Sequence, residues 1–309
     1  MEQYKSPNKF IQYELWKACK IGCKFCCNKK QKDIDKVESL LYVLEKLDDK
    51  EVDEYNEIGF IGGEFFNDEI SDEKVRELFY KVFEKVANKI NQGKISKLYI
   101  TTALIFDMNN YLIPFLNYLK SFGILDKTLL CTSYDVMYRF YTKEREDLWK
   151  NNMLKLYEMF PEMGLHTETI LTQGFIDAVL NETFSITEFC KTYHTRMDYI
   201  EPASGLYYNN KKECAEDLPG FFPTKSSYIK FLKKVAIDNK EIDLPSFLSM
   251  ELRSCKIHYI DGGMRLENDD RRSGEGKANP LDKTKHYEIG FIDSEDTMVG
   301  IARMMLEMI

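Results

Sequence analysis

Two patterns of apolar residues alternate along the first two thirds of the chain. Short apolar runs predict buried strands, and between them apolar residues recur every three to four positions, as on one side of a helix. The alternation predicts an α/β fold with a parallel sheet, and periodicity alone allows a partial barrel or an open, doubly wound sheet. Strands are predicted at 10–16, 57–61, 97–104, 128–133, 165–171 and 197–202. Helices are predicted at 36–47, 72–91, 111–122, 148–160 and 175–180, with Ser71 as the N-cap of the second.

The pattern changes after residue 202. Residues 203–227 are rich in turn formers and aromatic side chains, and residues 228–235 predict a short amphipathic helix. The charged, glycine-rich stretch 262–280 predicts a loop, followed by a strand at 287–292 and a methionine-containing helix from residue 294. We therefore divide the chain into a core, residues 1–205, and a C-terminal extension, residues 206–309, that completes or covers it.

Composition narrows the class of protein. The chain has 309 residues, 44% of them hydrophobic, which is enough for a sizeable core. The net charge of −8 does not favour nucleic acid as a partner, because an acidic surface repels phosphates. We expect no membrane association, because no apolar run is as long as a membrane span and residues 1–5 lack signal-peptide character. The sequence predicts a cytoplasmic protein with reduced thiols.

Three cysteines share one short segment after the first predicted strand. Cys19, Cys23 and Cys26 have C-x3-C-x2-C spacing, and Cys27 fits a small buried apolar residue better than a ligand. Clustered thiolates suit iron–sulfur clusters and zinc, although free thiols are a further alternative. Closed structural centres take four ligands, so a set of three leaves one metal position open, as catalytic centres do.

A second motif follows the second predicted strand. Gly62-Gly63-Glu64 comes directly after residues 57–61 and about forty residues beyond the cysteines. A glycine pair at a strand end is often only a turn, but it also lets backbone approach a ligand closely. The carboxyl ends of parallel strands meet at one edge of a sheet, so both motifs are expected at the same edge.

Together these motifs resemble those of the radical S-adenosylmethionine (SAM) superfamily, and the resemblance covers roughly residues 8–205. It implies a partial (β/α)6 barrel, TIM-like, and a [4Fe–4S] cluster held by Cys19, Cys23 and Cys26. S-adenosyl-L-methionine would chelate the fourth iron and be cleaved reductively to a 5′-deoxyadenosyl radical, which abstracts hydrogen from a substrate. The family often continues with proline after Gly-Gly-Glu, where this chain has Phe65.

The resemblance also implies a set of residues around SAM. The aromatic before the third cysteine packs near the adenine, a C-x-N ending follows, and the Gly-Gly-Glu segment holds the amino group. A Ser-x-Asp-like ending on the fourth strand lies near SAM or substrate. In this sequence the matching residues are Phe25, Asn28, Gly62, Gly63, Glu64, Ser133 and Asp135.

Polar residues inside predicted buried strands are candidates for the substrate pocket. Glu14 lies in the first strand, and His166 and Glu168 share one face of the fifth. We treat these three as candidate catalytic residues, with a satisfied buried polar group or an exterior position as the alternative. Glu201, at the end of the sixth strand, is a further candidate for cofactor binding.

The substrate is open at this stage: a small molecule, a peptide or a protein. Resemblance to the superfamily implies an electron donor such as flavodoxin or ferredoxin. Within the superfamily, the alternative functions are those of a glycyl-radical activating enzyme or a peptide-modifying maturase. Cys190, Cys214 and Cys255 are scattered rather than grouped in C-x2-C sets, which favours a single cluster over an added auxiliary one. An alternative outside the enzymes is a non-catalytic interaction module that binds zinc or an Fe–S cluster.

Overall fold

The computed structural model describes most of the predicted core and parts of the extension. The described residues are 10–26, 35–200, 218–221, 224, 226–227, 230–231 and 234, and the strands at 255–258, 264–267, 275–276 and 287–288. Asn28 and Glu201, both predicted site residues, and Cys27 and Cys214 lie outside the described residues. No helix in this described part is both long enough and apolar enough to cross a membrane.

The described strands build one main sheet and one small one. The main sheet has the order β6-β5-β4-β3-β2-β1-β7-β8. Its strands are β1 (Phe10–Glu14), β2 (Glu57–Ile61), β3 (Lys97–Thr101), β4 (Thr128–Ser133), β5 (Gly164–Ile170), β6 (Arg196–Ile200), β7 (Cys255–His258) and β8 (Met264–Glu267). Strands β1 to β6 are parallel and adjacent in chain order, β7 joins β1 in parallel, and β8 is antiparallel to β7. The small sheet pairs β9 (Glu275–Gly276) with β10 (Tyr287–Glu288).

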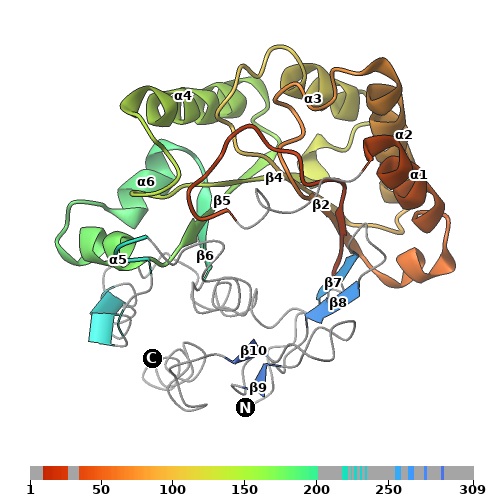
Figure 1. Cartoon of the computed structure of the whole chain (residues 1–309). Helices are drawn as coiled ribbons and strands as arrows, with labels where there is room; N and C mark the ends of the chain where they lie inside the picture. Colours follow the sequence, from red (N-terminus) through yellow and green to blue (C-terminus); the bar gives the residue numbers. More distant parts are fainter. Residues whose placement is uncertain are drawn as a thin grey trace.

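Helices alternate with the strands of the parallel sheet. They are α1 (Lys36–Lys46), α2 (Glu73–Asn91), α3 (Leu112–Ser121), α4 (Lys143–Met159), α5 (Gln173–Leu180) and α6 (Ile186–Thr192), with short 3-10 turns at η2 (Lys50–Glu54) and η3 (Leu125–Lys127). Right-handed crossovers between strands in simple sequential order place the helices on one side of the sheet, as Figure 1 shows. The order of β1 to β6 does not reverse, and the parallel strand β7 lies on the other side of β1.

One face of the sheet, which we call the helix-covered face, holds the main core. It consists of alternate strand residues such as Ile11, Ile58, Leu98, Leu130 and Leu165, all buried. They belong to a single apolar cluster to which all six helices contribute. The helix members of this cluster include Leu40, Phe79, Phe115, Trp149, Phe175 and Phe189.

The other face, which we call the opposite face, has a smaller cluster of apolar side chains among the described residues. Phe10, Tyr99 and Cys131 form a separate apolar cluster there, with the rings of Phe10 and Tyr99 5.1 Å apart. The Tyr99 hydroxyl donates a hydrogen bond of 3.1 Å to the buried carboxylate of Glu57. The register places His166 on this face beside Cys131. The ionisable side chains of Glu57 and His166 therefore lie on the side away from the helices.

Three details of the helices differ from the sequence predictions. Helix α2 is capped by Asp72, whose carboxylate accepts from the Val75 N–H at 3.0 Å, rather than by Ser71. Helix α4 starts at Lys143, five residues before the predicted start, because its first turn is charged and carries no apolar periodicity. Helix α6 was not predicted, since seven residues are too few to set up a clear period.

The extension also differs from expectation. Strands β8 and β9 lie inside residues 262–280, which were predicted to be a loop, and β7 was not predicted at all. Strands of two to four residues carry too little alternation to be recognised. The pairing of β7 with β1 brings residues of the predicted extension into the main sheet. The boundary at residue 205 stays a prediction.

Candidate functional site

The cysteine loop leaves the carboxyl end of β1. Cys19 is exposed, Cys23 is buried and Cys26 is partly buried, and the Cys26 N–H donates to the Cys23 carbonyl at 3.1 Å. Within the described residues, no three His, Cys, Asp or Glu side chains are arranged as a metal-binding group. The three thiols thus share one loop without forming a closed ligand set.

The glycine pair packs directly against the start of the cysteine loop. The Gly63 N–H donates to the Trp16 carbonyl at 2.7 Å, and the Glu64 N–H donates to the Ala18 carbonyl at 3.1 Å. A Cβ on Gly63 would lie 1.7 Å from the Ala18 oxygen, and one on Gly62 2.2 Å from the Trp16 oxygen. Gly62 also has a φ of +140°, which side chains rarely allow. Both glycines are therefore needed for the two motifs to touch.

The Glu64 side chain is turned into the protein. Its carboxylate accepts from the Phe66 N–H at 2.9 Å, from the Thr102 hydroxyl at 3.0 and 3.1 Å and from the Ala103 N–H at 2.5 Å. Burial raises the pKa of Glu64 to about 7, against the lowering effect of these hydrogen bonds and of Arg139. The carboxylate consequently ties the β2–α2 loop to the β3–α3 loop, while the motif's backbone borders the cysteine loop.

Phe65, the residue after Gly62-Gly63-Glu64, packs into the interior. The side chain is fully buried, and its ring lies 5.1 Å from that of Trp16 in an edge contact. Trp16 in turn belongs to the main core next to Phe79. The residue after Gly-Gly-Glu thus anchors the motif to the core that supports the cysteine loop.

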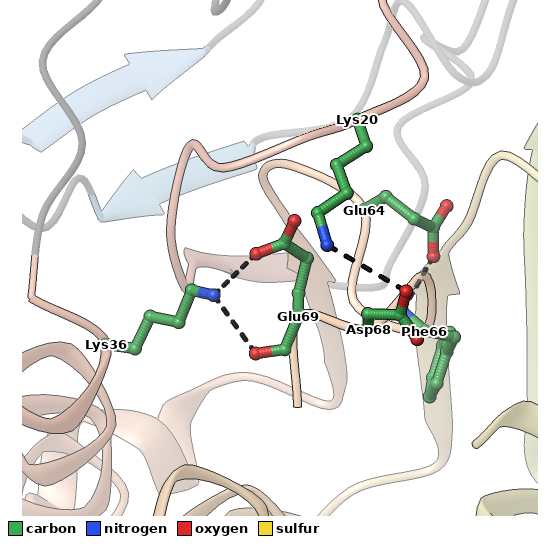
Figure 2. A network of polar contacts seen from close by, with 6 residues as sticks. All are labelled: Lys20, Lys36, Glu64, Phe66, Asp68 and Glu69. Carbon is green, nitrogen blue, oxygen red and sulfur yellow. Dashed lines mark hydrogen bonds and ion pairs between the residues drawn. The ribbon is translucent and has the colours of Figure 1, made fainter. Parts of the chain in front are cut away.

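Two lysines connect the loop after Gly-Gly-Glu with neighbouring segments (Figure 2). Lys36, the first residue of α1, donates to the Glu69 carboxylate at 2.5 Å and to its carbonyl at 3.0 Å. Lys20, from the cysteine loop, lies 3.9 Å from the Asp68 carboxylate, and both side chains are well exposed. The buried Lys36–Glu69 contact fixes the loop, whereas the exposed pair contributes little.

A turn after β4 presents an arginine to the cysteine loop. Asp135 is 2% exposed, and its Oδ1 accepts from the backbone N–H groups of Met137, Tyr138 and Arg139. Burial raises the pKa of Asp135, while those N–H groups and the Arg139 charge oppose the shift. Arg139 is 5% exposed, and its Nη1 lies 3.8 Å from the Cys23 sulfur.

Further contacts from the segment 138–145 hold the backbone of the cysteine loop. The Lys24 N–H donates to the Tyr138 carbonyl at 3.3 Å, the Tyr141 hydroxyl to the Gly22 carbonyl, and the Arg145 Nη2 to the Ile21 carbonyl at 2.8 Å. Sequence reasoning missed this segment, because charges in the first turn of a helix normally indicate a solvated surface. The available signal was Arg139, a cation inside an aromatic run.

The predicted strand residues fall on the opposite face. Glu14 is the last residue of β1 and is 5% exposed, and His166, 7% exposed, pairs in register with Cys131. Ser133, the last residue of β4, and Glu168, within β5, are register partners, and both are partly buried. The structure therefore brings Ser133, His166 and Glu168 together.

Two remaining predictions concern the edges of the site. Phe25 is 8% exposed and its ring lies 6.1 Å from that of Phe221, which places it beside the described part of the extension. Cys190 lies in α6 and is partly buried. The side chain of Cys255, like Cys214, lies outside the described residues.

Comparison with known proteins adds no family to this picture. No protein-family model and no curated protein sequence matches the chain. Functional inference therefore starts from the site's own residues and contacts.

Proposed function

We propose that this protein is a radical SAM enzyme in which Cys19, Cys23 and Cys26 hold a [4Fe–4S] cluster. One observation carries the proposal: the Gly62-Gly63-Glu64 backbone is hydrogen bonded to Trp16 and Ala18, just before Cys19, so the two motifs are in direct contact. Because β1 and β2 are neighbouring parallel strands, the loops that follow them lie at the same edge of the sheet, where both motifs can contact one ligand.

The donor set fits the proposed group. Three thiolates on one loop suit iron, and the missing fourth ligand leaves an iron for the amino and carboxylate groups of SAM. When bound, the cluster supplies the electron that cleaves the SAM sulfonium to a 5′-deoxyadenosyl radical, which abstracts hydrogen from the substrate. The protein holds the cysteine loop through Gly63 and Glu64 and through contacts from the segment 138–145.

The architecture supports the same proposal. Six parallel strands in sequential order, with helices on one side, are consistent with the proposed partial (β/α)6 barrel, in which the site would lie at the carboxyl ends of the strands. The substrate would face Ser133, His166 and Glu168 on the opposite face. The proposal also includes a cytoplasmic setting and an electron donor such as flavodoxin or ferredoxin, because oxidising conditions would destroy the cluster.

Anaerobic reconstitution tests the proposal. We expect brown protein with about four irons per chain, a reducible [4Fe–4S] signal and SAM-dependent formation of 5′-deoxyadenosine. C23A should lose the iron and the product, whereas the matched variant C190S, whose thiol lies in α6, should keep both. Product formation by C23A at the wild-type rate would refute the assignment. Colourless protein with about one zinc and no SAM binding would favour the interaction module instead.

A further inference from the structure

The Arg139 side chain joins the cysteine loop to the rest of the site. Its Nη1 lies 3.8 Å from the Cys23 sulfur, and its Nη2 donates to the Ala103 carbonyl at 3.3 Å. The N–H of the same Ala103 donates to the Glu64 carboxylate. One guanidinium thus connects the loops that follow β1, β3 and β4, and through Ala103 it reaches the loop after β2.

The backbone around Arg139 and Ala103 is fixed on both sides. Asp135 accepts from three successive N–H groups of the turn that carries Arg139. After Ala103, Leu104 has a φ of +56°, and the Asn152 amide of α4 donates to the Leu104 carbonyl at 3.0 Å. A non-glycine residue with positive φ persists only where its surroundings hold it. Arg139 therefore has a set position rather than a mobile one.

A buried cation beside a sulfur ligand has a defined electrostatic effect. A [4Fe–4S] core with three thiolates is anionic, and one-electron reduction adds a further negative charge. A nearby positive charge and an N–H···S contact stabilise the reduced form more than the oxidised form. Reduction potential consequently rises when such a group is present.

We propose that Arg139 is a positioning residue that fixes the Cys23 thiolate and raises the reduction potential of the cluster bound to it. The inference rests on the proposed function. In the step concerned, one electron from a low-potential donor, dithionite in the experiment, converts the [4Fe–4S] core from the 2+ to the 1+ state without transfer of a proton. The role differs from catalysis because Arg139 acts through the ligand Cys23.

A redox titration followed by electron paramagnetic resonance tests this role on the reconstituted full chain. We expect R139Q to lower the midpoint potential by about 60 mV, which is a tenfold change in the ratio of reduced to oxidised cluster. R139K keeps the charge and should shift the potential by less than half as much. R145Q is the matched control, because Arg145 holds the same loop through a carbonyl rather than a sulfur, and its shift should be the smallest.

The outcomes separate this inference from the proposed function. Wild-type protein without iron refutes the proposed function before Arg139 is considered. If the wild type holds the cluster, an R139Q potential equal to the wild-type value, or an equal shift in R145Q, overturns the role of Arg139. Loss of iron in R139Q with its retention in R139K supports the role, whereas equal loss of iron in both variants shows that packing rather than charge matters and overturns it.

Discussion

The two faces of the sheet differ in what their side chains contact. On the helix-covered face, apolar strand residues pack into one cluster with members of all six helices. On the opposite face, the apolar cluster formed by the described residues consists of Phe10, Tyr99 and Cys131, with Ile61 and Leu129 beside it. Polar strand residues, His166 and Glu168 among them, share this second face.

The two faces therefore differ in how much they contribute to folding stability. Burial of apolar surface is the main source of folding free energy, and among the described residues it is concentrated on the helix-covered face. The described part of the opposite face has a smaller apolar cluster and carries His166 and Glu168. The cysteine and Gly-Gly-Glu loops lie at the edge where both faces end, with Trp16 and Phe65 anchoring them in the core.

The largest effect is expected at the centre of the helix-covered face. Phe79 is fully buried, and its ring lies 4.8 Å from that of Phe83 and 5.3 Å from that of Phe115. We expect F79A to lose about 3–5 kcal/mol of unfolding free energy, measured by urea denaturation. L41A is the control, because Leu41 is 51% exposed and its truncation should change stability by about 0.5 kcal/mol at most. A loss below about 1 kcal/mol in F79A would show that this aromatic cluster is not the core.

The next largest loss of stability is expected at the edge of the sheet, where the cysteine and Gly-Gly-Glu loops lie. E64A leaves the N–H groups of Phe66 and Ala103 and the Thr102 hydroxyl without their buried acceptor. We expect a loss of about 3 kcal/mol in the same assay, because buried unsatisfied donors are costly. E64Q keeps one acceptor oxygen and should lose less than half as much. Equal stability of E64A and wild type would mean that these contacts do not hold the loops together.

A smaller effect is expected on the opposite face. E168Q keeps the shape of a partly buried side chain that lies outside the main core, so its unfolding free energy should stay within about 1 kcal/mol of wild type. Reconstituted E168Q should also keep its iron and its substrate-free formation of 5′-deoxyadenosine, since Glu168 is assigned to the substrate side. Loss of iron in E168Q would contradict the assignment of Glu168 to the substrate pocket and assign it to the cofactor site instead.

The smallest change in unfolding free energy is expected for an ion pair on the protein surface. Asp53 binds Lys89 at 2.6 Å and Lys94 at 2.9 Å, and these hydrogen bonds lower the pKa of Asp53 below its usual value of 3.8. Because the folded-state pKa is lower, the stabilisation is present above the unfolded-state pKa and is lost as pH falls through the folded value. We expect D53N to cost about 0.5 kcal/mol or less at pH 7, with no difference from wild type at about pH 2. A difference that persisted in acid would contradict this origin.

Strand positions were predictable where an apolar run is bounded by polar residues. The bounds of β2 and β4 agree with the predicted ranges 57–61 and 128–133. Strand β1 is shorter than predicted because residues 15–16 continue the chain into the cysteine loop while still packing in the core. The short β7 could not be found, because its place is set by pairing with β1.

In the candidate site, too, some features were predictable from the sequence and others were not. C-x3-C-x2-C spacing and the glycine pair are local features, so the sequence by itself determined which chemical groups the two loops carry. Tertiary structure alone decided which loops meet. Arg139 lies 116 residues from Cys23 along the chain, and nothing in local periodicity encodes that distance. The parallel sheet brings them together, because strands that run in the same direction gather all their following loops at one edge.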